Sequence, residues 1–171
     1  MKRILSAVLM LIMLLSLSKS LPAQAKLNIL PQRTSPVKIE KYETQFKTPP
    51  EYRYGAVVHK IAFKNITRQL VDAVQFRIIS FDVFQGYQSQ IALICTEPLM
   101  PGMPVRGEWY NDYEEAFMFG RGILYVEKIK YSDGQLWIAD QENILFSIKS
   151  ARVDIKQVSL EAGTSRFLNM R

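Results

Sequence analysis

Alternation of apolar and polar residues dominates the pattern along this chain. Residues 71–83 and 122–131 are rich in apolar residues that polar ones interrupt, and a period of two is typical of a strand with one buried face. Turn-forming residues separate these runs, among them Asp133-Gly134, a pair that suits a tight hairpin. The clearest run covers 57–64, with Val57, His59, Ile61 and Phe63 on one face and Val58, Lys60, Ala62 and Lys64 on the other.

Strands are expected throughout the chain, and no long helical pattern precedes the C-terminal tail. Short strands separated by turn signals are typical of a β-sandwich. The pattern therefore predicts one all-β domain, an immunoglobulin-like antiparallel β-sandwich of about seven strands. A last apolar run, residues 144–148, lies before the tail. The expected strands cover residues 37–46, 57–64, 71–83, 89–95, 105–110, 122–131 and 135–139.

The N-terminus has the three parts of a secretory signal peptide. Lys2 and Arg3 are followed by a nearly continuous apolar run, residues 4–15, and then by Ala23-Gln24-Ala25, a small-x-small cleavage site. The apolar run is shorter than the roughly 20 residues that a membrane-spanning helix needs. We expect cleavage after Ala25, export to the periplasm or the medium, and no stable membrane span in the mature chain.

These features divide the chain into four segments. We expect a signal peptide (1–25), an N-terminal leader with a possible first strand (26–50), the β-sandwich domain (51–149) and a C-terminal tail (150–171). Three cations and no acids leave with the signal peptide, which lowers the formal charge from +6 to +3. Because nucleic-acid binding needs a clustered basic face, which the mature chain lacks, we expect no nucleic-acid partner.

Four segments resemble motifs of a known group of bacterial exported domains. Residues 63–67 resemble the apolar-x-Asn-x-Thr edge of bacterial immunoglobulin-like domains. Residues 76–82 with Gly86 resemble the aromatic-aspartate turn of FxLYD-type domains, although Ser-Phe-Asp stands where those have Leu-Tyr-Asp. Residues 100–102 and 126–137 are similar to their Pro-Gly turn and closing hairpin. The resemblance covers residues 55–140, apart from an insertion at 111–121, and implies an immunoglobulin-like fold, export and no catalytic residues.

The residues that usually carry chemistry are few. Cys95 and His59 are each the only residue of their type, so neither a disulfide within the chain nor the usual zinc ligand set can form. The acidic residues between 108 and 115 are interpreted as a solvated loop rather than as a calcium site or an acid-base pair. We expect no enzymatic activity, no catalytic residue, no metal site and no cofactor.

Aromatic residues gather in one loop region, and they are the candidate contact residues. Irregular loops rarely bury five large rings, and exposed rings suit a sugar face or a protein partner. Trp109 is the first candidate for the core. We expect a non-catalytic exported domain that acts in the cell envelope through contact with an unidentified envelope protein. The alternative is a small carbohydrate- or peptidoglycan-binding module that uses loop 109–119. The candidate contact residues are Trp109, Tyr110, Tyr113, Phe117 and Phe119.

Overall fold

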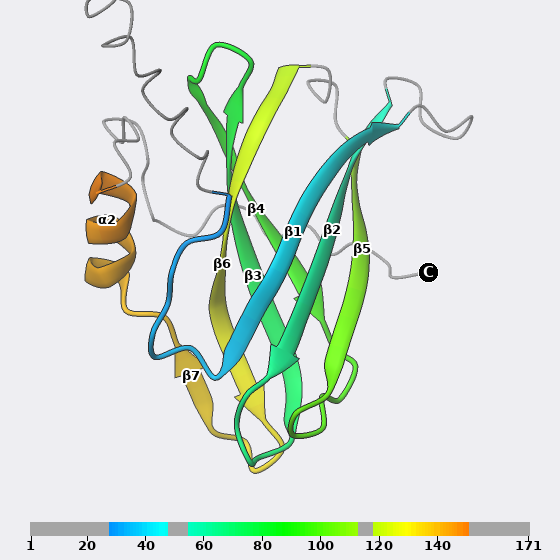
Figure 1. The fold of residues 1–171 in the computed structure, drawn as a ribbon, viewed down its shortest axis with the longest axis vertical. Coiled ribbons are helices and arrows are strands. Elements are labelled where there is room, and N and C mark those ends of the chain that lie inside the picture. Colours follow the sequence, from blue (N-terminus) through cyan, green and yellow to red (C-terminus); the bar gives the residue numbers. More distant parts are fainter. Residues whose placement is uncertain (1–27, 48–54, 113–117, 151–171) are drawn as a thin grey trace, which may run out of the picture.

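The fold is a sandwich of two antiparallel sheets. The computed structural model describes residues 28–47, 55–112 and 118–150 (Figure 1). The expected signal peptide and nearly all of the expected tail lie outside these residues. The strands in the described part form a three-stranded sheet, β1-β2-β5, and a four-stranded sheet, β4-β3-β6-β7. The elements are β1 (Val37–Lys47), β2 (Ala56–Asn65), β3 (Val71–Asp82), β4 (Tyr87–Cys95), β5 (Pro104–Asp112), β6 (Phe119–Tyr131), β7 (Leu136–Ile138) and α2 (Gln141–Ser150).

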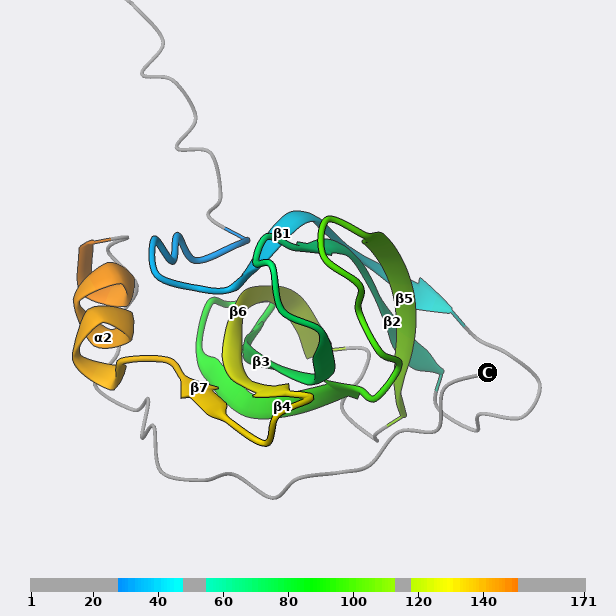
Figure 2. The ribbon, with the colours of Figure 1, turned by 90° about the horizontal axis from the view of Figure 1, so that it is seen from below.

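The strand order confirms the predicted immunoglobulin-like β-sandwich of about seven strands. Every strand pair within the two sheets is antiparallel. The chain crosses between the sheets after β2, β4 and β5, which is the Greek-key type of connection found in such sandwiches. Seen end-on in Figure 2, the two sheets face each other, and α2 lies to one side of the four-stranded sheet.

The main hydrophobic core lies between the sheets. The predicted inward face of β2 is confirmed, because Ile61 and Phe63 both belong to this core. The rings of Phe63 and Phe76 meet edge to face at 4.9 Å, and Phe76 meets Trp109 in the same way at 6.0 Å. Burial of large apolar side chains is the main contribution to the stability of such a domain.

A second core covers the outer face of the four-stranded sheet. Ile79, Phe81 and Ile123 point away from the main core and pack with Ile144 and Ile148 of α2. The apolar run 144–148 is therefore part of a helix. Asp140 caps this helix, since its carboxylate accepts the Glu142 backbone N–H at 2.9 Å. With a spacing of four residues, Ile144 and Ile148 share the one helix face that the sheet buries.

The leader extends the four-stranded sheet along β6. The backbone N–H of Leu30 donates to the carbonyl of Leu124 at 2.9 Å, and the N–H of Leu124 donates to the carbonyl of Asn28 at 2.8 Å. The Gln32 side chain continues this pairing, donating to the Val126 carbonyl at 2.8 Å and accepting the Val126 N–H at 2.7 Å. The leader pairs in parallel with the part of β6 that β7 does not reach.

Candidate functional site

The turn between β3 and β4 is held rigidly by one carboxylate. Asp82 Oδ1 accepts the backbone N–H groups of Phe84 and Gly86, each at 2.8 Å. The Asp82 backbone N–H donates to the carbonyl of Gly86 at 2.9 Å. Gln85 adopts a left-handed conformation with φ of 69°, which is uncommon for a residue other than glycine. These bonds fix the backbone around the two residues at the tip of the turn.

Two apolar side chains project from this fixed turn into solvent. Phe84 is 80% exposed and Val83 is 51% exposed. A turn normally carries polar residues or glycine at its tip. An exposed aromatic ring on a constrained backbone loses little conformational entropy when it is covered by a partner. The turn is therefore built in a way that suits contact with another molecule.

The start of β6 lies directly against this turn. The Val83 backbone N–H donates to the Met118 carbonyl at 2.9 Å. Gly120 permits this approach, because a Cβ at that position would overlap the backbone carbonyl of Asp82. The half-buried Phe119 ring meets His59 edge to face at 5.7 Å. This ring therefore points between the sheets, and we use the term turn surface for Val83 and Phe84 alone.

The contact residues predicted from the sequence differ in burial and position in the structure. Trp109 is 2% exposed, and its indole Nε1 donates to the carbonyl of Ile94 at 3.2 Å. Trp109 belongs to the main core. It was the predicted contact residue expected first in the core, and it offers no contact surface. Tyr110 is half-buried, with the Lys47 ammonium 5.8 Å from the centre of its ring. Phe119 adjoins the turn, and Tyr113 and Phe117 lie outside the described residues.

Sequence reasoning missed Val83 and Phe84. Val83 is the last residue of the expected strand 71–83, and Phe84 follows it, outside the predicted contact loop 109–119. The available signal was an apolar pair enclosed by Asp82 and Gly86. An aspartate and a glycine at that spacing predict a fixed turn, and large apolar residues inside such a turn have no core to enter.

The single histidine is buried beside a tyrosine. His59 is fully buried, and its Nδ1 lies 3.0 Å from the Tyr42 hydroxyl. Burial lowers the pKa of His59 to about 3 and raises the pKa of Tyr42. The Cys95 thiol is buried as well, which raises its pKa. Within the described ranges, no three His, Cys, Asp or Glu side chains gather where they could bind a metal ion.

The Asn-x-Thr segment, residues 65–67, holds the loops together at the end of β3 that lies opposite the Asp82 turn. Asn65 is fully buried, and its Nδ2 donates to the carbonyls of Gln69 and Leu99 at 2.8 and 2.9 Å. Its Oδ1 accepts the N–H and the hydroxyl of Thr67 at 2.9 and 2.8 Å. The Asn65 carbonyl accepts the Gly102 N–H at 2.9 Å. This motif joins two loops of the sandwich, as an Asx-turn with tertiary contacts.

A buried ion pair lies on the outer face of the four-stranded sheet. Arg77 donates through Nε and Nη2 to the two oxygens of Glu127, both at 2.8 Å. Gln75 adds a third bond to the same carboxylate at 2.7 Å. The Arg77 side chain is 4% exposed and that of Glu127 is 20% exposed. The geometry is bidentate, which is the strong form of this interaction.

The chain has partial similarity to solved structures. No protein-family model matches the chain, and no curated protein matches its sequence. A hypothetical protein from Peptoclostridium difficile 630 is similar in structure, with a TM-score of 0.47 and 8% identity over 70% of this chain and 92% of that one. A Northeast Structural Genomics Consortium target has a TM-score of 0.42 and 17% identity, covering 61% of this chain and 80% of that one. In the described part of the chain, no helix is both long and apolar enough to cross a membrane.

Proposed function

We propose that this protein is a non-catalytic exported domain that acts in the cell envelope through contact with another protein. The observation that carries this proposal is the exposure of Phe84, at 80%, on a turn whose backbone is fixed by Asp82. Aromatic anchors contribute much of the binding energy of protein interfaces. The turn surface supplies such an anchor, with the exposed Val83 next to it in the turn.

The chemistry of the turn surface favours a protein partner over a glycan. A sugar-binding platform needs exposed rings together with hydrogen-bonding groups that meet the hydroxyls. The Val83 and Phe84 side chains offer apolar carbon alone, and Oδ1 of the neighbouring Asp82 is already engaged by two backbone N–H groups. Trp109, the largest ring of the predicted contact loop, is buried. Binding of carbohydrate or peptidoglycan remains the alternative that the experiment distinguishes.

Export is the second part of the proposal and rests on residues 1–25. Cleavage after Ala25 leaves Lys26 as the first residue of the mature protein. The leader that follows pairs with β6 from Asn28 onward, so this cut would leave every described residue in place. N-terminal sequencing of the protein recovered from the envelope fraction is expected to begin at Lys26. Recovery of a chain that begins at Met1 would contradict cleavage.

Site-specific crosslinking tests the contact function. A photoreactive phenylalanine analogue at position 84 is expected to crosslink to one envelope protein in living cells. The matched control carries the same analogue at position 146, since Phe146 is 71% exposed on a different element, α2. The Phe84→Ser variant should lose capture of that protein, with stability unchanged within about 0.5 kcal/mol, as is usual for surface substitutions.

Two outcomes would overturn the proposal. Equal crosslinking from positions 84 and 146 would show that the turn surface is not selective. Sedimentation of the wild-type protein with purified peptidoglycan, lost in Phe84→Ser and retained in Phe146→Ser, would establish the carbohydrate-binding alternative.

A further inference from the structure

The outer face of the three-stranded sheet gathers cations from three separate strands. Alternate residues of a strand point to opposite sides of its sheet, so the strand register shows which side chains of β1, β2 and β5 share this face. The sequence, which holds no run of Lys and Arg, predicted no clustered basic face, and the register corrects that expectation. We use the term basic face for the five cations on the half of this surface nearest Asn65, which are Lys38, Lys41, Lys60, Lys64 and Arg106.

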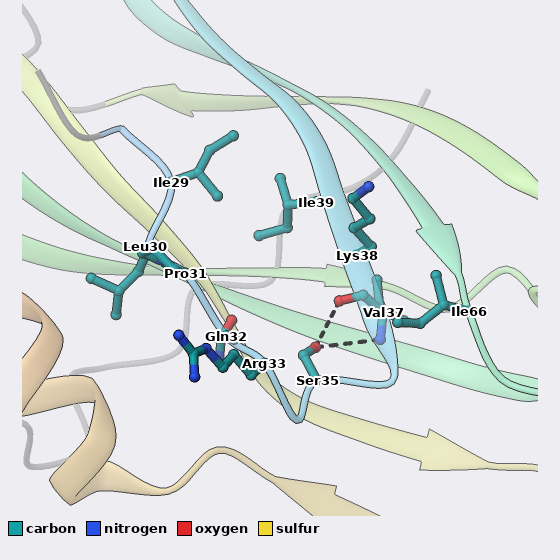
Figure 3. A pocket seen from close by; sticks show the side chains of 10 residues that line it. All are labelled: Ile29, Leu30, Pro31, Gln32, Arg33, Ser35, Val37, Lys38, Ile39 and Ile66. Carbon is teal, nitrogen blue, oxygen red and sulfur yellow. Dashed lines mark hydrogen bonds between the residues drawn. The ribbon is translucent and has the colours of Figure 1, made fainter. Parts of the chain in front are cut away.

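Two rows of paired residues across the sheet hold four of these cations. Lys38 lies directly opposite Lys64, and in the next row Lys41 and Arg106 lie on either side of Ala62. In Figure 3 the side chains of Lys38 and Ile39 leave β1 on opposite sides. Because Ile39 packs on the main core, Lys38 points to the outside of the sandwich.

Acidic residues offset part of this positive charge. Lys41 Nζ lies 2.9 Å from a Glu43 carboxylate oxygen, and Lys60 Nζ lies 3.1 Å from a Glu108 carboxylate oxygen. A third acid, Glu40, is exposed in the bulge of β1. Five cations and three acids leave this half of the sheet face positive.

Three cations of the basic face lack an acidic partner. Among the ion pairs of the described residues, none involves Lys38, Lys64 or Arg106. Lys38 and Arg106 are exposed, and Lys64 is half-buried. Like charges directly opposite each other on a sheet are unfavourable for the folded protein, and an anionic partner removes that repulsion. The basic face therefore has charge complementarity to an anion.

The basic face is open and has no apolar centre. The strands β1, β2 and β5 form the front layer in Figure 1, and among the described elements none lies over them, since α2 and the leader lie to one side in Figure 2. By the strand register, no exposed large apolar side chain of the described residues projects from this sheet face. The core of a stable protein interface is apolar and depleted of charge, so this face is unlike one.

The arrangement of the cations fits a planar anionic surface better than a nucleic acid. The cations are spread over three neighbouring strands, so they can approach one plane together. A single nucleic-acid strand instead presents a line of phosphates and needs aromatic rings on which its bases stack. The ring on this sheet face, Tyr110, is half-buried, with the Lys47 ammonium 5.8 Å from its centre.

We propose that the basic face binds a membrane surface that contains anionic lipids. Lys38, Lys64 and Arg106 meet the lipid phosphates, and the three-stranded sheet lies against the headgroups. Binding is electrostatic and depends on salt, because the face carries no large apolar side chain to enter the hydrocarbon region. The basic face shares no residue with the turn surface, so this proposal is independent of the proposed contact function.

Vesicle sedimentation tests this surface. The protein, as its own cells process it, is mixed with vesicles of phosphatidylglycerol and phosphatidylcholine in equal parts, and with vesicles of phosphatidylcholine alone. Binding to the anionic vesicles alone is expected at about 0.1 M salt and should be lost at about 1 M, where the Debye length falls to about 3 Å. Each cation near an anionic bilayer strengthens binding about fivefold, so K38E with R106E should weaken binding about 25-fold or more.

The matched control is K128E with K130E, which makes the same change of net charge at two exposed residues of β6. These lysines flank Ile129, which belongs to the main core, so they point to the outer face of the other sheet. Packed sheets are about 10 Å apart, which is a Debye length at about 0.1 M salt. The control should therefore lose less than about threefold in binding, and circular dichroism should show unchanged melting in both pairs.

Protection of lysines from acetylation is a second measurement, made on the unaltered protein. Anionic vesicles should protect Lys38 and Lys64 from an N-hydroxysuccinimide ester and leave the two control lysines reactive. No binding to anionic vesicles would overturn the proposal, and so would equal binding to neutral ones. Equal losses in the two charge-reversal pairs, or equal protection of all four lysines, would overturn it because net charge alone would then explain binding. Tighter binding to a DNA duplex than to anionic vesicles, lost in K38E with R106E, would make a nucleic acid the partner instead.

Discussion

The buried Asn65 side chain provides the sharpest test of how the loops of this sandwich are held. Asn65→Ala removes an amide that donates to two backbone carbonyls and accepts from the backbone and hydroxyl of Thr67. The Thr67 hydroxyl has one proton and lies within reach of both Asn65 Oδ1 and the Gln69 carbonyl. Three to four hydrogen bonds therefore depend on Asn65.

The expected loss of stability follows from this count. A typical hydrogen bond contributes about 1 kcal/mol net, and a buried carbonyl left without a partner adds to the loss. We therefore expect Asn65→Ala to lower the free energy of unfolding by about 3–4 kcal/mol. This is a large part of the roughly 5–15 kcal/mol available to a small domain. The melting temperature should fall by about 10 °C for a chain of this size.

Urea unfolding followed by tryptophan fluorescence measures this loss, because Trp109 is buried in the main core. Thr67→Val is the graded control, since it removes one hydroxyl and should cost about 1 kcal/mol. Asn143→Ala is the matched surface control, because Asn143 donates to Asp140 in an exposed pair. A loss below about 1 kcal/mol for Asn65→Ala would show that water replaces these bonds and that Asn65 does not join the loops.

Three further predictions concern buried groups. His59, whose pKa is lowered to about 3 by burial, stays neutral in the folded state while the unfolded chain binds a proton below pH 6.5. Stability should therefore fall by about 1.4 kcal/mol per pH unit as pH drops through this window. Urea unfolding at pH 7 and pH 5 checks this, and a His59→Gln variant with the same slope would refute it. Arg77→Met leaves the Glu127 carboxylate without its bidentate partner and should cost about 3–5 kcal/mol, whereas Arg77→Met with Glu127→Leu should recover most of that stability in the same assay. Trp109→Ala should cost about 3–5 kcal/mol, and a near-native melting temperature by circular dichroism would contradict its place in the core.

The strands were predictable because the two faces of each strand differ in polarity. Residues 57–64 alternate in polarity, and the structure buries Ile61 and Phe63 in the main core. Apolar and polar residues alternate with a period of two wherever one face of a strand packs on a core. The turn at Asp133-Gly134 was predictable for a local reason as well, since Gly134 has a φ of 86° and glycine adopts such a conformation without strain.

The helix α2 and the turn surface were harder to find. The run 144–148 is short and apolar, and its helical face is defined only by Ile144 and Ile148. Those residues are buried by a second core on the far side of the sheet, whose members come from distant parts of the sequence. Phe84 was missed for a related reason. Its exposure depends on the bonds from Asp82, which only the folded turn displays.

The candidate contact loop was predicted from composition, and composition does not separate buried rings from exposed ones. Trp109 pairs with His59 across β5 and β2 and points into the main core, while Tyr110, the next residue in the strand, is half-buried. The alternation of a strand therefore divides neighbouring aromatic residues between the core and the surface.

The leader has a consequence for the order in which the chain folds. Gln32 bonds to Val126, which lies 94 positions later in the sequence. In a chain that emerges from its N-terminus, the leader therefore appears first and must wait for β6 before it can pair. Contacts between distant positions form slowly, because a long loop must close before they stabilise the chain. Until then, Leu30 and the outer face of β6 are uncovered. Association between incomplete chains is therefore most favourable in that interval, when the exposed edge of β6 can pair with another molecule.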